Sequence, residues 1–328
     1  MTFDMLPDDV LLDIFDFYRL DSPFFPWMWV TLAHVSPRWR QVVLASPRRL
    51  DLHFLCRPQT HVRELLNFLP LTMPIMISNS FDSPTSTTLY PSHALSIEDG
   101  GQVIAAIEQR DRVWWIHLQE LPSAFLEKLA IMMQETFPTI RFVRLWAADE
   151  NQPVPVLPEG FLGGSAPVLE SLFLKGIPFP EPSKLLQSTN DLVHLVLQRV
   201  PDSGYISPEA MITALSTCSK LEMLVIGFLS ENLRLDSDGP DSTSQQINSI
   251  TRLSLPVLTN FEFDGGGGYF DNFVPRIEGP LLARDNNPFW QHETSEIRIV
   301  HYEASFTQTG FSSRYISRPL IITDLEDE

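Results

Sequence analysis

One apolar pattern recurs through most of the chain: an apolar residue, two other positions, a second apolar residue, one other position and a third apolar residue. The second and third members lie two residues apart, so they share one face of a β-strand. Each copy therefore predicts a short strand with a buried face. We call the repeated apolar residues the anchors. They are Val113, Ile116 and Leu118; Ile140, Val143 and Leu145; Leu169, Leu172 and Leu174; Leu192, Leu195 and Leu197; Leu221, Leu224 and Ile226; and Leu258, Phe261 and Phe263.

The segments between these strands carry apolar residues at helical spacing. After one strand, a helix with apolar residues at 125, 129, 132 and 133 is expected, with Ser123 as a candidate N-cap, and Ser207-Pro208-Glu209 is typical of another helix start. Successive copies end 23 to 37 residues apart, roughly the length of a leucine-rich repeat. One unit alone cannot bury its anchors, so stacking of units predicts a continuous core. We expect an α/β solenoid of strand–helix units over residues 51–328.

Two further segments, Leu50-Asp51-Leu52 and Ile75-Met76-Ile77, are candidate degenerate copies at the start of this region. The irregular spacing leaves a non-repeating α/β domain as the alternative. A doubly wound sheet is disfavoured because no Gly-rich turn follows the first strand. Residues 78–99 are rich in Ser, Thr and Pro, and residues 236–246 are acidic and polar, so both predict long loops.

The first 20 residues predict an amphipathic helix. Pro7 suits the first helical turn, and Asp8 and Asp9 favour the positive end of the helix dipole. Spacings of three and four place one set of apolar residues on a common face, whereas Leu12 and Phe17 lie off it. That set is Val10, Leu11, Ile14, Phe15 and Tyr18. Apolar side chains on more than one side indicate either a helix buried on both sides or a helix that keeps one side for a partner.

A second helical motif follows. Ser36 and Pro37 form an N-cap and first-turn pair, and the helix should end before Pro47 because the residue before proline avoids helical geometry. Leu32 and Val35 belong to a short helix before it. The chain therefore predicts three small helices within about 45 residues, too few to bury a comfortable core of their own.

These residues resemble the F-box, whose pattern runs from Leu-Pro and an acidic residue through an apolar helix ending in Ile-Phe to Val-x-x-x-Trp with basic neighbours. The matching residues, in order, are Leu6, Pro7, Asp9, Leu11, Leu12, Ile14, Phe15, Val35, Arg38, Trp39 and Arg40. Further phrases at 161–167, 176–180 and 204–211 resemble a large basidiomycete-fungal group of F-box proteins with degenerate leucine-rich repeats. This resemblance covers residues 4 to about 282.

The resemblance implies a substrate receptor of a Skp–cullin–F-box ubiquitin ligase. An F-box module at residues 1–50 would bind the Skp adaptor, which links it to the cullin core, and the repeats would bind a target protein. Such a chain acts by proximity and makes or breaks no bond itself. The expected adaptor-binding residues are Leu6, Pro7, Val10, Leu11, Leu12, Ile14, Phe15, Val35 and Trp39. A repeat scaffold that engages no ligase is the alternative from another class.

The target surface is expected on the strands. In a solenoid the anchors point inward, so the residues between them line the opposite, usually concave, face. Clustered exposed aromatic residues suggest a partner surface. The expected target-binding residues are Trp115, His117, Phe142, Arg144, Phe173, Val196, Val225 and Glu262. The alternative is that a loop or the N-terminal helices cover this face.

Composition excludes several other partners. The net charge is −18 with a pI of about 4.8, and residues 51–328 carry nearly all of the excess. Such a field repels phosphate backbones, so no nucleic-acid partner is expected. No apolar run is long enough to span a membrane, and no basic segment followed by an apolar run marks a signal peptide. The two cysteines offer no disulfide framework, which favours a reducing compartment, so we expect a cytoplasmic or nuclear location.

Catalytic and ligand motifs are weak. The four glycines at 265–268 lack the Lys and Ser/Thr of a phosphate loop, and Gly163-Gly164-Ser165 lacks the second glycine of a nucleophile elbow. His53 and His61 lie near Cys56 without zinc-ligand spacing. We expect no catalytic residue, metal or cofactor. A hydrolase is the remaining alternative, although the sequence contains no recognisable nucleophile–base set.

Overall fold

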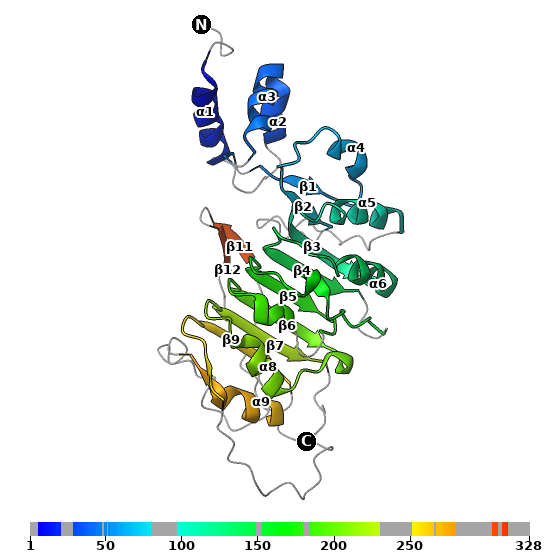
Figure 1. The fold of residues 1–328 in the computed structure, drawn as a ribbon, viewed down its shortest axis with the longest axis vertical. Helices are drawn as coiled ribbons and strands as arrows, with labels where there is room; N and C mark the ends of the chain where they lie inside the picture. Colours follow the sequence, from blue (N-terminus) through cyan, green and yellow to red (C-terminus); the bar gives the residue numbers. More distant parts are fainter. Residues whose placement is uncertain are drawn as a thin grey trace, which may run out of the picture.

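The structure is a computed structural model that describes residues 6–20, 29–47, 49–50, 52–79, 97–148, 153–179, 184–229, 251–265, 267–279, 304–307 and 310–313. The predicted loop at 236–246 and most of the one at 78–99 lie outside these residues. Figure 1 shows three helices at the N-terminal end, followed by a long stack of parallel strands with helices beside it.

The three N-terminal helices form where the sequence predicts them. They are α1 (Asp8–Leu20), α2 (Trp29–Val35) and α3 (Pro37–Ala45). Ser36 caps α3, because its hydroxyl oxygen accepts a hydrogen bond from the backbone N–H of Trp39 at 3.1 Å. The backbone N–H of Leu11 donates to the carbonyl of Pro7, which places Pro7 at the start of α1.

An eight-stranded, all-parallel sheet forms the body of the molecule. Its strands are β1 (Phe54–Cys56), β2 (Ile75–Ser78), β3 (Val113–Leu121), β4 (Phe142–Ala147), β5 (Ser171–Lys175), β6 (His194–Val200), β7 (Met223–Phe228) and β9 (Asn260–Asp264). They occur in chain order, and each pairs in parallel with the next. The prediction of an α/β fold is confirmed, including the six strands that the anchors mark.

Two small sheets complete the described strands. In one, β8 (Leu253–Ser254) pairs in parallel with β10 (Ile277–Glu278), and in the other, β11 (Ala304–Thr307) pairs antiparallel with β12 (Gly310–Ser313). The candidate copy at Ile75–Ile77 is β2. The candidate at Leu50–Leu52 is wrong, because the N–H groups of both leucines bond back to carbonyls at the end of α3, Ser46 and Pro47, before β1 begins.

Helices connect the strands. The α-helices are α4 (Val62–Leu66), α5 (Ile97–Ile107), α6 (Ser123–Met132), α7 (Lys184–Ser188), α8 (Pro208–Leu215) and α9 (Gly267–Phe273), with 3₁₀ turns η2 (Phe161–Gly164), η3 (Asp202–Gly204) and η4 (Val274–Arg276). The predicted cap Ser207 is confirmed, since its hydroxyl accepts from Ala210 N–H. The predicted cap Ser123 is wrong. The cap position belongs to Pro122, because the helix starts one residue earlier than expected.

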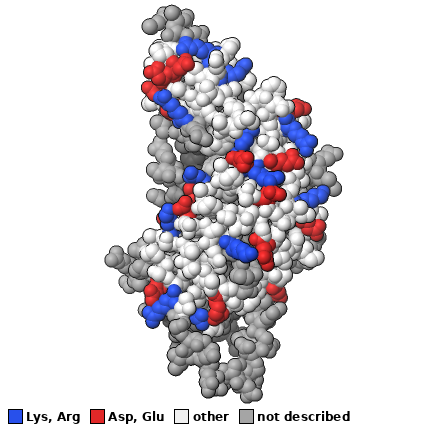
Figure 2. Space-filling view, in the orientation of Figure 1, with Lys and Arg blue, Asp and Glu red and all other residues white. Residues whose placement is uncertain are grey.

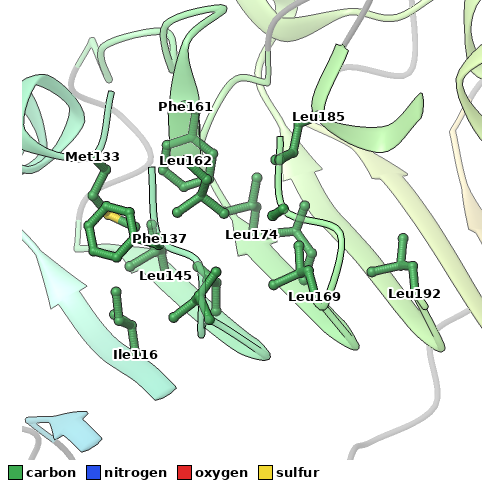
Figure 3. Packing of buried hydrophobic residues seen from close by; sticks show 14 of the residues in the cluster. Ile116, Met133, Phe137, Leu145, Phe161, Leu162, Leu169, Leu174, Leu185 and Leu192 are labelled. Atoms are coloured by element: carbon green, nitrogen blue, oxygen red, sulfur yellow. The ribbon is translucent and has the colours of Figure 1, made fainter. Parts of the chain in front are cut away.

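The anchors form two continuous rows across the sheet. Ile116 pairs in register with Val143, and this row continues through the middle anchor of each later strand to Phe261. All anchors except Phe261 are buried. They join the helices in one apolar cluster, and Figure 3 shows strand residues Leu145 and Leu174 packed beneath η2. The same cluster contains residues of α1 and α3, so an unbroken core links the N-terminal helices to the sheet.

Strands β3 and β6 share an irregularity that reveals a repeat in the sequence. The register shifts in both, and both contain a non-glycine residue with positive φ, Glu120 (53°) and Arg199 (52°). The surrounding sequences match as Leu-Gln-x-apolar-Pro at 118–122 and 197–201. In each the bulge turns the following apolar residue back into the core. Backbone geometry thus adds a second likeness between two units that the anchor pattern already relates.

Candidate functional site

Helix α1 has two apolar sides with opposite environments. The side chains of Leu11, Leu12 and Phe15 are buried, at 0%, 8% and 0% exposure, within the core shared with α2 and α3. On the other side Val10 and Ile14 are 38% and 37% exposed. Phe17, 69% exposed, lies one further turn along that side. We call Val10, Ile14, Phe17 and the exposed Val35 of α2 the outer stripe.

This division corrects the sequence interpretation in two ways. Spacing placed Leu11 and Phe15 on one face with Val10 and Ile14, and the F-box resemblance assigned Leu11, Leu12 and Phe15 to the adaptor contact. In the structure these three side chains are buried in packing. Phe17, which spacing set aside, is the most exposed apolar residue of α1 among those described. The reason is tertiary: α3 lies against α1, with the Phe15 and Trp39 rings 4.8 Å apart. Trp39 is therefore a packing residue that positions the stripe.

Polar contacts hold α1 against its neighbours. The Arg38 guanidinium donates to the Leu6 carbonyl and, at 2.9 Å, to Asp8. Arg49 pairs with Asp13 and lies 3.8 Å from Asp16. These pairs are partly exposed, so each contributes at most about 1 kcal/mol. Their main effect is to fix the orientation of the outer stripe. Leu6 is partly buried against the core, whereas Pro7, which directly precedes α1, is exposed.

The second candidate surface is the sheet face opposite the anchors. The register places six of the predicted residues in one row across neighbouring strands, and we call it the outward row. It runs His117, Arg144, Phe173, Val196, Val225 and Glu262. Trp115 and Phe142 occupy the adjacent row, with Ser171 and His194. Phe142 is thus not in line with Phe173, because Arg144 holds that position.

The expected exposure of this face is wrong. Seven of the eight predicted target-binding residues are only 2–8% exposed, and Glu262 alone is partly exposed. Parallel strands hold equivalent positions about 4.8 Å apart, so large side chains touch across the row. The Trp115 and Phe142 rings stack with centroids 3.6 Å apart, and the Arg144 guanidinium lies 4.6 Å from the Phe173 centroid. The face is a second apolar cluster within the fold.

Burial also sets the ionisation of two histidines on this face. Desolvation, and secondarily the positive charge of Arg144, hold the pKa of His117 well below its ordinary value. Burial lowers the pKa of His194 to about 4. Both rings are therefore neutral near neutral pH. The His117 Nε2 atom lies 2.7 Å from the side-chain nitrogen of Gln119.

The register creates one serine–histidine pair that sequence reasoning missed. The Ser171 hydroxyl lies 2.9 Å from Nδ1 of His194, 23 positions away along the chain. A general base acts best when its pKa is near the working pH, and a nucleophile must reach its substrate. His194 has a pKa of about 4 and Ser171 is 5% exposed. This pair satisfies buried polar groups and gives no support to the hydrolase alternative.

The other residues considered for chemistry have structural surroundings. Gly163 has a φ of 72°, and a Cβ there would lie 2.6 Å from the Thr136 side chain, so the glycine serves a tight turn. Cys56 is buried, and burial raises the pKa of its thiol to about 12. The His53 ring stacks on Trp114 at 4.4 Å. Among the described residues, no group of three His, Cys, Asp or Glu side chains could hold a metal ion.

Charge on the surface is mixed. Ion pairs join residues at the beginnings of successive strands, as in Arg141 with Glu170 and Lys220 with Asp191. Figure 2 shows basic and acidic side chains side by side over the visible face, with no large area of one sign. No described helix has the length and apolar character needed to cross a membrane.

Comparison with models of known protein families and with curated proteins finds no match to this chain.

Proposed function

We propose that this protein is the substrate receptor of a Skp–cullin–F-box ubiquitin ligase, in which the outer stripe of α1 binds the Skp adaptor. The proposal joins two independent supports. The ordered residues from Leu6 to Arg40 resemble the F-box, and α1, the first helix of that stretch, leaves three apolar side chains exposed. They stand at positions 10, 14 and 17, which repeat at helical spacing.

The single observation that carries the proposal is the separation of the two sides of α1. A surface helix normally has one apolar stripe, directed at its own core. Here the inner side already packs on α3, so the outer stripe is surplus to folding. Exposed apolar side chains on successive turns of one helix, here Val10, Ile14 and Phe17, form a patch of the kind that marks a site of interaction. The proposed contact set is therefore Val10, Ile14, Phe17 and Val35, with Leu6 and Pro7 retained from the sequence prediction. Phe17 is added to that prediction, and the packing residues Leu11, Leu12, Phe15 and Trp39 are removed from it.

We also propose that the body is a leucine-rich-repeat-like solenoid. Its strands follow chain order without reversal, and the described helices join the anchors in one cluster. A doubly wound sheet reverses its strand order and has helices on both faces. The shared bulge of β3 and β6 adds a repeat-like feature.

The activity proposed for such a body is positional. The core is continuous from α1 to β9, so a target bound on the repeats would be held in a defined orientation to the adaptor. Tethering raises the local concentration of the target at the separate enzyme that transfers ubiquitin. The chain itself need supply no catalytic group.

Co-purification of the full chain with a Skp-type adaptor tests the proposal. The Ile14→Asp/Phe17→Asp variant should lose the adaptor, because charges forced into an apolar interface cost several kcal/mol. A matched control is Phe68→Asp/Leu71→Asp, which changes two exposed apolar residues outside the helices. A wild-type chain that does not bind the adaptor would instead favour a scaffold that engages no ligase. Binding retained by the folded double variant of α1 would contradict the proposed contact.

A further inference from the structure

A recess of about 210 Å³ lies at the carboxyl ends of three central strands. Gly176 directly follows β5, Arg199 is the penultimate residue of β6, and Leu229 directly follows β7. In parallel sheets, ligands commonly bind outside the carboxyl ends of the strands. The lining consists of Pro153, Val154, Gly176, Arg199, Pro201, Ser203 and Leu229, and is mainly apolar.

The walls of the recess are fixed by backbone contacts between the loops. Gly176 N–H donates to the Gln198 carbonyl, and Leu229 N–H to the Val200 carbonyl, both at 2.9 Å. The loop that contains Pro153 and Val154 is tied to the next one by a 3.1 Å bond from Leu157 N–H to the Pro178 carbonyl.

Gly204 allows the loop after β6 to lie close against the loop after β5. A Cβ on Gly204 would lie 2.5 Å from the Cα of Pro178, so only glycine allows this approach. With two prolines also in the lining, the recess has little freedom to lose on binding, which favours affinity.

The rim extends the apolar surface beyond the recess. Leu229 is 39% exposed, and Val156, two residues from the lining residue Val154, is 45% exposed. Arg199 is the charged member of the lining and is exposed, with its backbone held at a φ of 52° by the β6 bulge. Strained residues of this kind concentrate at ligand-binding sites.

We propose that this recess binds one apolar side chain of an extended polypeptide, of leucine size, with an acidic neighbour lying towards Arg199. Sites for drug-sized molecules occupy about 300–1,000 Å³, so the recess suits a single side chain rather than a whole cofactor. The rim would contact the flanking peptide backbone. The inference that this polypeptide belongs to the ligase target rests on the proposed function, whereas the binding of the side chain does not.

Methyl-labelled NMR of the full chain tests the site with N-acetyl-leucinamide as the probe and N-acetyl-glycinamide as the negative control. The leucine probe should shift the methyl resonances of Val154 and Leu229 with a Kd in the millimolar range, as expected for so few atoms. The glycine probe should leave both unchanged. Equal responses to the two probes, or no response to either, would overturn the proposal.

A pair of variants provides the matched control. Leu229→Asp and Val257→Asp change residues of nearly equal exposure, 39% and 36%, but only the first lines the recess. Leu229→Asp should weaken binding of the leucine probe about tenfold or more, because it places a charge in the apolar wall. Val257→Asp should leave binding as in the wild type. Equal weakening in both variants would contradict the assignment.

The charged side of the site is tested with the amides of N-acetyl-Leu-Asp and N-acetyl-Leu-Lys. The aspartyl probe should bind more tightly than the lysyl probe, and Arg199→Gln should abolish the difference. A preference that survives Arg199→Gln would overturn the role of Arg199. Adaptor co-purification with Leu229→Asp separates this site from the proposed function: loss of the leucine site with the adaptor retained is expected. A chain that binds leucine but no adaptor would refute the ligase assignment alone.

Discussion

The sequence predicts contact residues in both the outer stripe of α1 and the outward row of the sheet. The fold leaves the stripe exposed and buries most of the row. Both place apolar residues on the side of an element away from its own core, namely Val10, Ile14 and Phe17 in α1 and Phe173, Val196 and Val225 in the sheet. In α1 that side remains exposed, with Phe17 at 69%, whereas in the sheet Phe173 is 2% exposed. An apolar residue facing away from one core is therefore a candidate contact only where it does not itself belong to a second buried cluster.

The difference follows from the two kinds of element. Helix α1 lies at one end of the molecule, and within the described part of the chain its buried side packs on the core shared with α2 and α3. A parallel sheet is generally covered on both faces, and its strands are near-continuous apolar runs. Strand β7 has this character, because all of its residues from Met223 to Phe228 are buried. The outward row is mostly buried, so substitutions in it should lower the stability of the protein.

The largest expected effect is on that stability. Phe173→Asp should lower the free energy of unfolding by about 4 kcal/mol or more, because it removes a buried ring and buries a charge. Chemical denaturation of this variant beside Ile14→Asp sharpens the comparison. The exposed Ile14 position should change the unfolding free energy by about 0.5 kcal/mol or less. Similar losses at the two sites would erase the distinction between the surfaces.

The next effect concerns the anchors. Leu172 is the middle anchor of β5 and is fully buried, so Leu172→Ala should lower the free energy of unfolding by about 2–5 kcal/mol. Val154 is only partly buried, and Val154→Ala should cost much less. Denaturant midpoints with unchanged slopes give both values. Equal losses at Leu172 and Val154 would argue against the assigned register.

The unfolding free energy should depend on pH because of two histidines on the sheet face opposite the anchors, His117 and His194. Burial lowers the pKa of His194 from 6.5 to about 4 and also lowers that of His117. Between pH 6.5 and about 4 the unfolded chain binds protons that the folded chain does not. The contribution of these histidines to stability is therefore complete above pH 6.5 and falls as the pH decreases towards 4. For His194 the full loss is roughly 3 kcal/mol, at about 1.36 kcal/mol per pKa unit.

Unfolding free energies measured between pH 5 and 7 check this expectation. His194→Gln should reduce the slope over that range, even though loss of the Ser171 contact lowers stability overall. An unchanged slope would show that burial of His194 does not control it.

The smallest expected stability change is at the outer stripe itself. Val35 is 57% exposed at the end of α2, so Val35→Ser should alter the unfolding free energy by no more than about 0.5 kcal/mol. Trp39→Ala, on the inner side, should cost more because Trp39 packs on Phe15. A large loss from Val35→Ser would mean that the stripe contributes to the fold.

The sequence predicted the positions of the strands better than it predicted which surfaces are exposed. Repeated anchors located the strands and their inward residues because strand periodicity is a local property. The periodicity did not locate β1. The apolar pair Leu50 and Leu52 has the spacing of a strand, but the N–H groups of these leucines bond to the carbonyls of Ser46 and Pro47, just after α3. The continuous apolar run at 223–226 was a sequence signal for burial on both faces, and it outweighs the aromatic content of the outward positions.

Features that depend on register were beyond the sequence. Ser171 and His194 meet only because β5 and β6 pair in one particular alignment. The recess at 153–229 collects loops from four connections, and the phrase at 176–180 that contributes to the family resemblance gives no signal of a binding recess. On α1, helical spacing gave the correct residue types but not which side faces α3, because Leu11 and Val10 are adjacent and equally apolar.

Calorimetric titration of the full chain with a Skp-type adaptor tests the central claim most directly. The wild type and the Phe68→Asp/Leu71→Asp control should bind with the same Kd. The Ile14→Asp/Phe17→Asp variant should bind at least about 100-fold more weakly, equivalent to roughly 2.8 kcal/mol, with its unfolding free energy unchanged. A folded Ile14→Asp/Phe17→Asp variant whose Kd stays within about threefold of the wild type would contradict the claim that the outer stripe is the adaptor surface.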